Sequence, residues 1–157
     1  MTPAVHFLRK TGVSFSLLDY SHDSRATSYG LEAAEKLNQP AHRVFKTLVV
    51  ESSDGQLAVA VIPVNQELNL KALALSLDTK KVKMTNPEKV ERTTGYVLGG
   101  VSPIAQKRLL PTYVDDSATQ FESIFISAGK RGLEIELSPS ELVRITQGRY
   151  EPLGISK

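Results

Sequence analysis

A lysine interrupts an apolar stretch that otherwise reads as a buried β-strand. Lys46 lies within Val44–Val50, whose sequence is VFKTLVV, and strands covered on both faces are near-continuous apolar runs. An unpaired ammonium is costly to bury, so this side chain extends to solvent, meets an anion or lines a cavity. In a cavity it could act as a Schiff-base nucleophile, a general base or an anchor for a carboxylate or phosphate.

A glycine-rich loop is the second candidate for chemistry. Gly99 and Gly100 follow an apolar segment that we expect to be a strand, and Val101, Ser102 and Pro103 complete the loop. Paired glycines permit positive φ and close approach of a ligand to bare N–H groups. The loop could bind an oxyanion, a carboxylate or a phosphate, or it could be a tight turn without a ligand. Its sequence matches neither a P-loop nor a dinucleotide fingerprint.

Few other residues show a catalytic pattern. The chain has no cysteine, and its histidines, His6, His22 and His42, lack metal-ligand spacing. Ser127 ends an apolar strand but does not sit in a nucleophile elbow. The hydroxyl of Tyr20 could reach a site, although such a tyrosine is more often a residue at the edge of the core. We therefore expect no metal, no cofactor and no thiol or histidine catalyst.

Basic residues gather in short clusters close to turns. The formal net charge of +2 is too small to indicate a nucleic-acid-binding protein, and we expect no DNA partner. Local clusters could still hold phosphates. Solvated surface lysines are the alternative for any one cluster. The clusters are Lys80, Lys81 and Lys83; Lys107 and Arg108; and Lys130 and Arg131.

The elements that must position these residues alternate along the chain. Capping residues followed by proline or leucine periodicity predict five helices, which begin after Thr2, Ser28, Asn69, Asn86 and Ser138. Apolar runs and alternation predict about seven strands, at residues 15–20, 44–50, 57–62, 81–84, 112–115, 123–127 and 133–137. Within the last of these, alternation places Glu134 and Glu136 on one face.

This order of elements indicates a single α+β domain spanning residues 1–157, with a mixed, largely antiparallel sheet or barrel. Its 157 residues are enough to bury a core. No apolar run reaches the roughly 18 residues of a membrane span, and the N-terminus lacks a signal-peptide pattern. We expect a cytoplasmic protein without a membrane partner.

Four separated motifs together resemble the YbaK/EbsC family, the free-standing relatives of the editing domain of prolyl-tRNA synthetases. The motifs are Tyr20 before Ser21-His22-Asp23, Val44-Phe45-Lys46-Thr47-Leu48, Gly95-Tyr96 leading to Gly99-Gly100-Val101-Ser102-Pro103, and Ser127-Ala128-Gly129-Lys130-Arg131-Gly132-Leu133-Glu134-Ile135-Glu136-Leu137. The resemblance covers nearly the whole chain and is strongest to the branch of Cys-tRNA(Pro) deacylases.

The resemblance implies a β-barrel-like sheet wrapped by helices and the removal of cysteine from mischarged Cys-tRNA(Pro), with Cys-tRNA(Cys) as a further candidate. It implies a catalytic site at Lys46, Gly99 and Gly100. It also implies that the substrate is bound by Tyr20, Phe45, Thr47, Val101, Ser102, Pro103, Ser127, Gly129 and Glu134. Related sequences can carry aspartate at the position of Glu134. The three basic clusters would bind tRNA, and prolyl-tRNA synthetase would be a transient partner.

An enzyme with so few reactive groups should take its nucleophile from the substrate. In this hypothesis the cysteinyl thiolate attacks its own ester carbonyl, which gives a cyclic thiolactone and frees the tRNA. Lys46 would hold the terminal nucleotide and favour the thiolate, and backbone N–H groups near Gly99 and Gly100 would bind the oxyanion. The alternatives are a non-catalytic tRNA- or nucleotide-binding module and a deacylase for another mischarged tRNA, such as Ala-tRNA(Pro).

Overall fold

The computed structural model describes all residues, 1–157, as five α-helices, ten strands and two short 3₁₀ helices. The helices are α1 (Pro3–Thr11), α2 (Tyr29–Lys36), α3 (Leu70–Ser76), α4 (Pro87–Thr94) and α5 (Pro139–Thr146), and the 3₁₀ helices are η1 (Ala41–Arg43) and η2 (Asp116–Gln120). The strands are β1 (Phe15–Asp19), β2 (Phe45–Ser52), β3 (Leu57–Pro63), β4 (Gln66–Leu68), β5 (Val82–Met84), β6 (Thr112–Asp115), β7 (Ile124–Lys130), β8 (Leu133–Leu137), β9 (Arg149–Glu151) and β10 (Gly154–Ser156).

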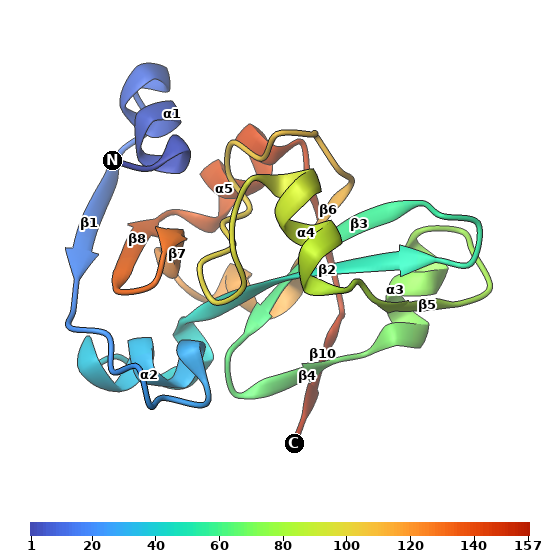
Figure 1. Cartoon of the computed structure of the whole chain (residues 1–157), viewed down its shortest axis with the longest axis horizontal. Helices are drawn as coiled ribbons and strands as arrows, with labels where there is room; N and C mark the ends of the chain where they lie inside the picture. Colours follow the sequence, from blue (N-terminus) through green and yellow to red (C-terminus); the bar gives the residue numbers. More distant parts are fainter.

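The strands form three sheets. The largest has the order β5-β2-β3-β6-β9, a second has the order β1-β8-β7, and β10 pairs with β4. Pairing is antiparallel except for β3 with β6 and β6 with β9, which are parallel. A bridge between Val44 and Phe125 links the entrance of β2 to β7. The five helices lie around these sheets, with α2 and α3 at opposite ends (Figure 1).

Strand β3 is apolar throughout because its two faces enter different cores. Val59 and Val61 join the larger core with α1, β7, β8 and α5, whereas Ala60 and Ile62 pack with α3 and Leu153. Side chains alternate between the faces of a strand, so a strand buried on both faces must be apolar at every position. All seven residues of β3 are buried.

The expected α+β fold with a mixed, largely antiparallel sheet is confirmed, and so are the five helices. Each α-helix begins at its expected cap: the side chains of Thr2, Ser28, Asn69, Asn86 and Ser138 accept hydrogen bonds from backbone N–H groups of the first turn. None of the helices combines the length and the apolar character that crossing a membrane requires.

Two expectations about strands are corrected. The segment before Gly99 is a loop and not a strand, because Val97 and Leu98 are exposed and the Gly100 N–H closes a turn on the Val97 carbonyl. The number of strands is ten and not about seven. The additional ones, β4, β9 and β10, are three residues each, too short to show a periodic pattern.

Candidate functional site

A cavity of about 420 Å³ opens where the start of β2 faces α2 and the glycine loop. Many of the residues expected at a site line it together: Tyr20, Phe45, Lys46, Thr47, Gly99, Val101, Ser127 and Glu134. They come from four separate stretches of the chain, which the crossing of β2, β7 and β8 brings together. The remaining lining residues are Thr27, Ser28, Tyr29, Gly30, Leu48, Leu98 and Lys157.

Lys46 lies on the second residue of β2, where it is partly buried at the wall of the cavity. It forms none of the ion pairs of the protein. Burial, together with the charge of Lys157, lowers the pKa of Lys46 below its ordinary value of 10.5. The side chain is therefore a cation without a carboxylate partner, as an anion-binding group should be.

Glu134 reaches the cavity from β8 and is almost fully buried, with a relative exposure of 6%. Burial raises the pKa of Glu134 to about 8, so the carboxyl group is largely protonated at neutral pH. The neighbouring Tyr20 is affected in turn, because burial and the charge of Glu134 raise the pKa of its hydroxyl to about 12. Tyr20 thus remains a hydrogen-bond donor at any physiological pH.

The glycine loop offers backbone donors at positions that differ from those expected. The Gly100 N–H already donates to the Val97 carbonyl at 2.9 Å, and Gly100 is not part of the cavity lining. By contrast, the N–H groups of Gly99 and Val101 have no acceptor within the protein, and both residues line the cavity. The donors available for an oxyanion are therefore those of Gly99 and Val101, which corrects the expectation for Gly100.

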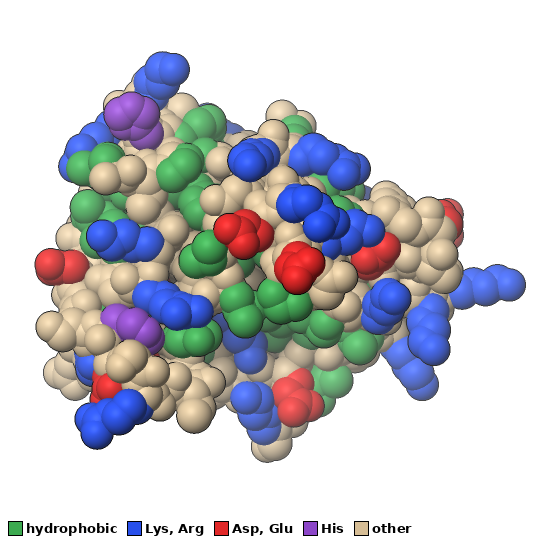
Figure 2. All heavy atoms as spheres, viewed as in Figure 1, with side chains coloured by type: hydrophobic (Ala, Val, Ile, Leu, Met, Phe, Trp, Pro, Cys, Tyr) green, Lys and Arg blue, Asp and Glu red, His purple; other side chains and the backbone are tan.

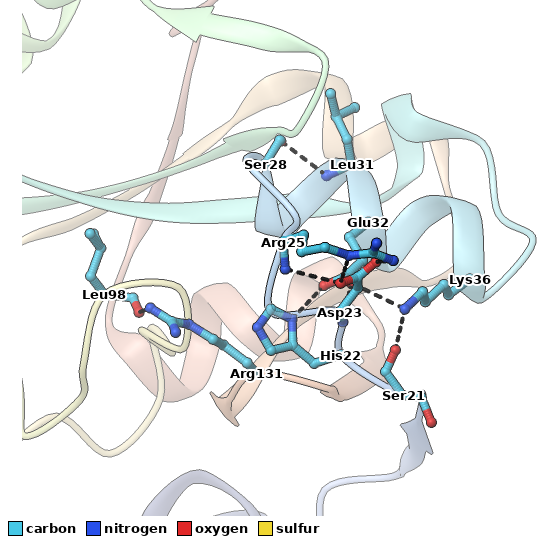
Figure 3. A network of polar contacts seen from close by, with 10 residues as sticks. All are labelled: Ser21, His22, Asp23, Arg25, Ser28, Leu31, Glu32, Lys36, Leu98 and Arg131. Carbon is cyan, nitrogen blue, oxygen red and sulfur yellow. Dashed lines mark hydrogen bonds and ion pairs between the residues drawn. The ribbon is translucent and has the colours of Figure 1, made fainter.

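Arg131, drawn in Figure 3 with its hydrogen bond to Leu98, joins the glycine loop to the start of α2. From the turn between β7 and β8, its guanidinium donates to the Leu98 carbonyl at 2.7 Å and lies 4.2 Å from the centre of the Tyr29 ring. Gly99 passes directly beside it: a Cβ at this position would lie 2.5 Å from Arg131 Nε and 2.8 Å from Tyr29 Cδ2. Three chain segments are thus packed together at the rim of the cavity.

A second polar network holds α2 to the loop that precedes it (Figure 3). The buried carboxylate of Glu32 is 2.7 Å from His22 Nδ1, accepts the Asp23 N–H at 2.7 Å and pairs with Lys36 Nζ at 3.1 Å. Burial alone would raise the pKa of Glu32, but these contacts outweigh it and lower the pKa. The network holds the loop before α2 in place, so Tyr29 keeps its position at the cavity.

Some expected site residues lie elsewhere. Ser102 is buried and its hydroxyl accepts the Ile104 N–H, while Pro103 lines a separate cavity of about 180 Å³ on the other side of the loop. Gly129 packs against Tyr96, since a Cβ there would lie 2.6 Å from the tyrosine ring. The structure therefore gives Ser102, Pro103 and Gly129 a place in the packing beneath the site and not in its lining.

The basic clusters do not form one continuous surface. In Figure 2 blue side chains are interspersed with acidic ones across the visible face. Lys83 on β5 lies opposite Glu51 at the far end of β2, about 16 Å from Lys46 at about 3.3 Å per strand residue. Lys80 and Lys81 precede Lys83 in the chain. Lys130 lies beside Arg131 at the cavity rim. Lys107 and Arg108 belong to the loop that carries Gly99.

Sequence reasoning missed several lining residues. Leu48 could have been found, because it is two positions from Lys46 and residues i and i+2 share a face of a strand. Thr27, Ser28, Tyr29 and Gly30 follow a loop whose course has no local signal. Lys157 is brought in by β10, whose pairing with β4 is visible only in the fold.

Known proteins resemble this chain in sequence. Residues 24–145 match the model of the aminoacyl-tRNA editing domain. The chain is 47% identical over 117 residues to the Enterococcus faecalis protein named "Putative Cys-tRNA(Pro)/Cys-tRNA(Cys) deacylase EbsC". The aligned residues make up 74% of this chain and 71% of the relative. A proline–tRNA ligase of Moorella thermoacetica is 29% identical over 112 residues, 67% of this chain but only 19% of the ligase.

The fold itself has a solved counterpart. A crystal structure described as "a putative trans-editing enzyme for prolyl tRNA synthetase" superposes with a TM-score of 0.85 at 20% identity and covers 99% of both chains. At this level of identity the superposition establishes the fold alone, while the family match rests on the sequence. This chain is a member of the aminoacyl-tRNA editing domain family.

Proposed function

We propose that this protein is a trans-editing deacylase that removes cysteine from Cys-tRNA(Pro), with Cys-tRNA(Cys) as a further substrate. The observation that carries the proposal is the composition of the cavity: an unpaired lysine, free backbone donors and a buried carboxyl group, with neither cysteine nor histidine in the lining. The relative in Enterococcus faecalis, named for the same two substrates, supports this assignment.

The cavity suits a reaction in which the substrate supplies the nucleophile. The cysteinyl sulfur attacks its own ester carbonyl; a carbon–sulfur bond forms and the carbon–oxygen bond to the terminal ribose breaks. The thiol proton ends on the ribose oxygen, and the products are a cyclic thiolactone and the free tRNA. No water or protein nucleophile takes part in this step.

The protein contributes binding and electrostatic stabilisation. The Lys46 ammonium favours the thiolate and the phosphates of the substrate, and the N–H groups of Gly99 and Val101 face the developing oxyanion; loss of one such donor typically costs about 10²–10³ in rate. Tyr20 and Ser127 provide hydroxyl groups for the ribose. Glu134, whose ionisation is favoured by a nearby cation, receives the substrate ammonium.

The basic residues would bind different parts of the tRNA. Lys130, Lys107 and Arg108 lie on the segments that carry the cavity rim, so we place them against the acceptor end. The Lys80–Lys83 cluster, about 16 Å away along β2 at about 3.3 Å per residue, would contact the acceptor stem. Because proline–tRNA ligases contain a segment similar to this chain, we also propose a transient complex with prolyl-tRNA synthetase in the cytoplasm.

The test is a deacylation panel. The protein is mixed with Cys-tRNA(Pro), Ser-tRNA(Pro), Ala-tRNA(Pro) and Pro-tRNA(Pro), ester loss is followed, and the products are identified by mass spectrometry. We expect rapid loss of cysteine as thiolactone and little loss of serine, since a hydroxyl is a much weaker nucleophile. Equal rates for cysteine and serine would contradict the substrate-thiol step. A preference for alanine would instead indicate a deacylase for Ala-tRNA(Pro).

Lys46 is tested in the same assay. Lys46→Ala should lose most of the activity, whereas Lys71→Ala, an exposed lysine on α3 outside the cavity, should keep it. Tight tRNA binding without cleavage of any of these esters would instead indicate a binding module.

A further inference from the structure

One of the two lysines of the cavity lies outside the residues matched by the family model. Lys157 lies beyond the matched residues 24–145, yet it lines the cavity together with Lys46. We propose that Lys157 and Lys46 form a two-cation subsite for the phosphate on the 5′ side of the terminal nucleotide of the substrate. The inference rests on the proposed function and names the group that this side of the cavity recognises.

A defined set of contacts holds the last strand at this place. The buried carboxylate of Asp115 accepts the N–H groups of Leu153 and Gly154, both at 2.8 Å. Leu153 is fully buried, and its carbonyl accepts the Asn69 N–H at 2.7 Å. Strand β10 then pairs with β4, Gly154 opposite Leu68 and Ser156 opposite Gln66. The backbone is therefore anchored up to Ser156, and Lys157, which is itself exposed, directly follows it.

Neither lysine has a partner of its own. No ion pair of the protein includes Lys46 or Lys157. The carboxylate whose charge reaches Lys46, that of Glu67, is exposed on β4 and does not line the cavity. Two like charges in one cavity repel each other, so an anion that bridges them stabilises both.

The charges of the cavity also give the substrate a direction. Besides the two lysines, the lining has one carboxyl group, that of Glu134, whose ionised form a nearby cation favours. Glu134 forms no ion pair with either lysine, so its carboxyl group is available to a cationic group of the substrate. The cationic amino group of the substrate belongs near Glu134. The phosphate, the anion nearest the ester in an aminoacyl-tRNA, belongs near the lysines.

A binding experiment tests the subsite without any chemistry. The affinities of the full-length protein for adenosine 5′-monophosphate and for adenosine are measured by NMR titration. We expect the monophosphate to bind about five- to tenfold more tightly, as one or two partly exposed charge contacts allow. Lys157→Ala leaves Lys46 in place and should weaken this preference, whereas Lys157→Arg and the control Lys71→Ala should retain it in full. A preference unchanged in Lys157→Ala, or absent in the wild type, overturns the proposal.

Kinetics separate this inference from the proposed function. With Cys-tRNA(Pro), Lys157→Ala should raise KM by up to about five- to tenfold, the phosphate preference expected above, at constant kcat. It should also reduce the slope of log KM against log salt concentration by about one, because one phosphate contact is lost. If Lys157→Ala cleaves Cys-tRNA(Pro) with unchanged KM and unchanged salt dependence, the subsite is refuted and the proposed function stands. A Lys157-dependent phosphate preference in a protein that cleaves no cysteinyl ester would refute the function and leave the subsite standing.

Discussion

Replacing Gly99 by alanine tests whether the packing at the cavity rim matters for catalysis. Gly99 has φ +86°, and so does Gly55 in the turn between β2 and β3. Alanine in the left-handed region costs roughly 1–2 kcal/mol. At Gly55 no atom lies within 4 Å of the new Cβ, so this strain is the whole cost. Gly55→Ala is therefore the matched control.

At Gly99 the same methyl group meets neighbours on two sides. The Cβ would lie 2.5 Å from Arg131 Nε and 2.8 Å from Tyr29 Cδ2, so both side chains must move. Arg131 then loses its contact with the Tyr29 ring, worth about 0.5–1 kcal/mol at an exposed site, and its hydrogen bond to Leu98, worth about 1 kcal/mol. We expect Gly99→Ala to cost about 3 kcal/mol in total, roughly 1.5–2 more than Gly55→Ala.

Urea unfolding and the deacylation of Cys-tRNA(Pro) measure the two consequences. Because Tyr29, Leu98 and Gly99 all line the cavity, Gly99→Ala should reduce kcat/KM by at least about tenfold, the equivalent of 1.4 kcal/mol, while Gly55→Ala leaves it unchanged. In an Arg131→Ala background the extra cost of Gly99→Ala should shrink, since one of the clashing groups is gone. Equal stability and equal activity of the two alanine variants would refute the packing argument.

Three further predictions concern buried polar groups. Because the folded-state pKa of Glu134, about 8, lies above its ordinary 4.5, its contribution to stability is full below pH 4.5 and is lost as the pH rises to 8; urea unfolding should show a steeper decline over this range for the wild type than for Glu134→Gln. Asp115→Ala removes the acceptor that anchors β10, and should cost about 2–4 kcal/mol in thermal or urea unfolding and raise the KM for Cys-tRNA(Pro) as Lys157→Ala does; an unaltered KM would contradict the anchoring role. The Thr47 hydroxyl is buried without a partner, so Thr47→Val should stabilise the protein by up to about 1 kcal/mol in urea unfolding; a loss of stability would contradict this reasoning.

Local signals made the helices predictable from the sequence. A capping side chain bonds N–H groups within its own first turn, and proline is tolerated at that turn for reasons internal to the helix. Thr2, Asn86 and Ser138 each precede a proline at the start of a helix. The long buried strand β3 was equally visible, since burial on both faces requires an uninterrupted apolar run.

Long-range contacts explain what the sequence did not reveal. Strands β4 and β10 exist because they pair with each other, at residues 66–68 and 154–156, and neither has a pattern of its own. The same holds for the site: Lys46 was recognisable as a cation in an apolar run, but nothing near Lys157 marks it as a neighbour. The contacts of Arg131 are likewise long-range: Tyr29 is about a hundred positions away from it in the chain, and Leu98 about thirty.

The electrostatics of the cavity explain why the reaction should depend on a charged substrate. The pKa of Lys46 is lowered because its ammonium is partly removed from water and repelled by Lys157, which means that the cationic form is destabilised in the free protein. A phosphate placed between the lysines relieves that cost, so polyanionic tRNA gains more from binding than an uncharged ester of cysteine would. The relieved ammonium remains beside the reacting group, where it can favour the thiolate. Substrate binding therefore depends on both lysines, whereas activation of the substrate thiol depends on Lys46.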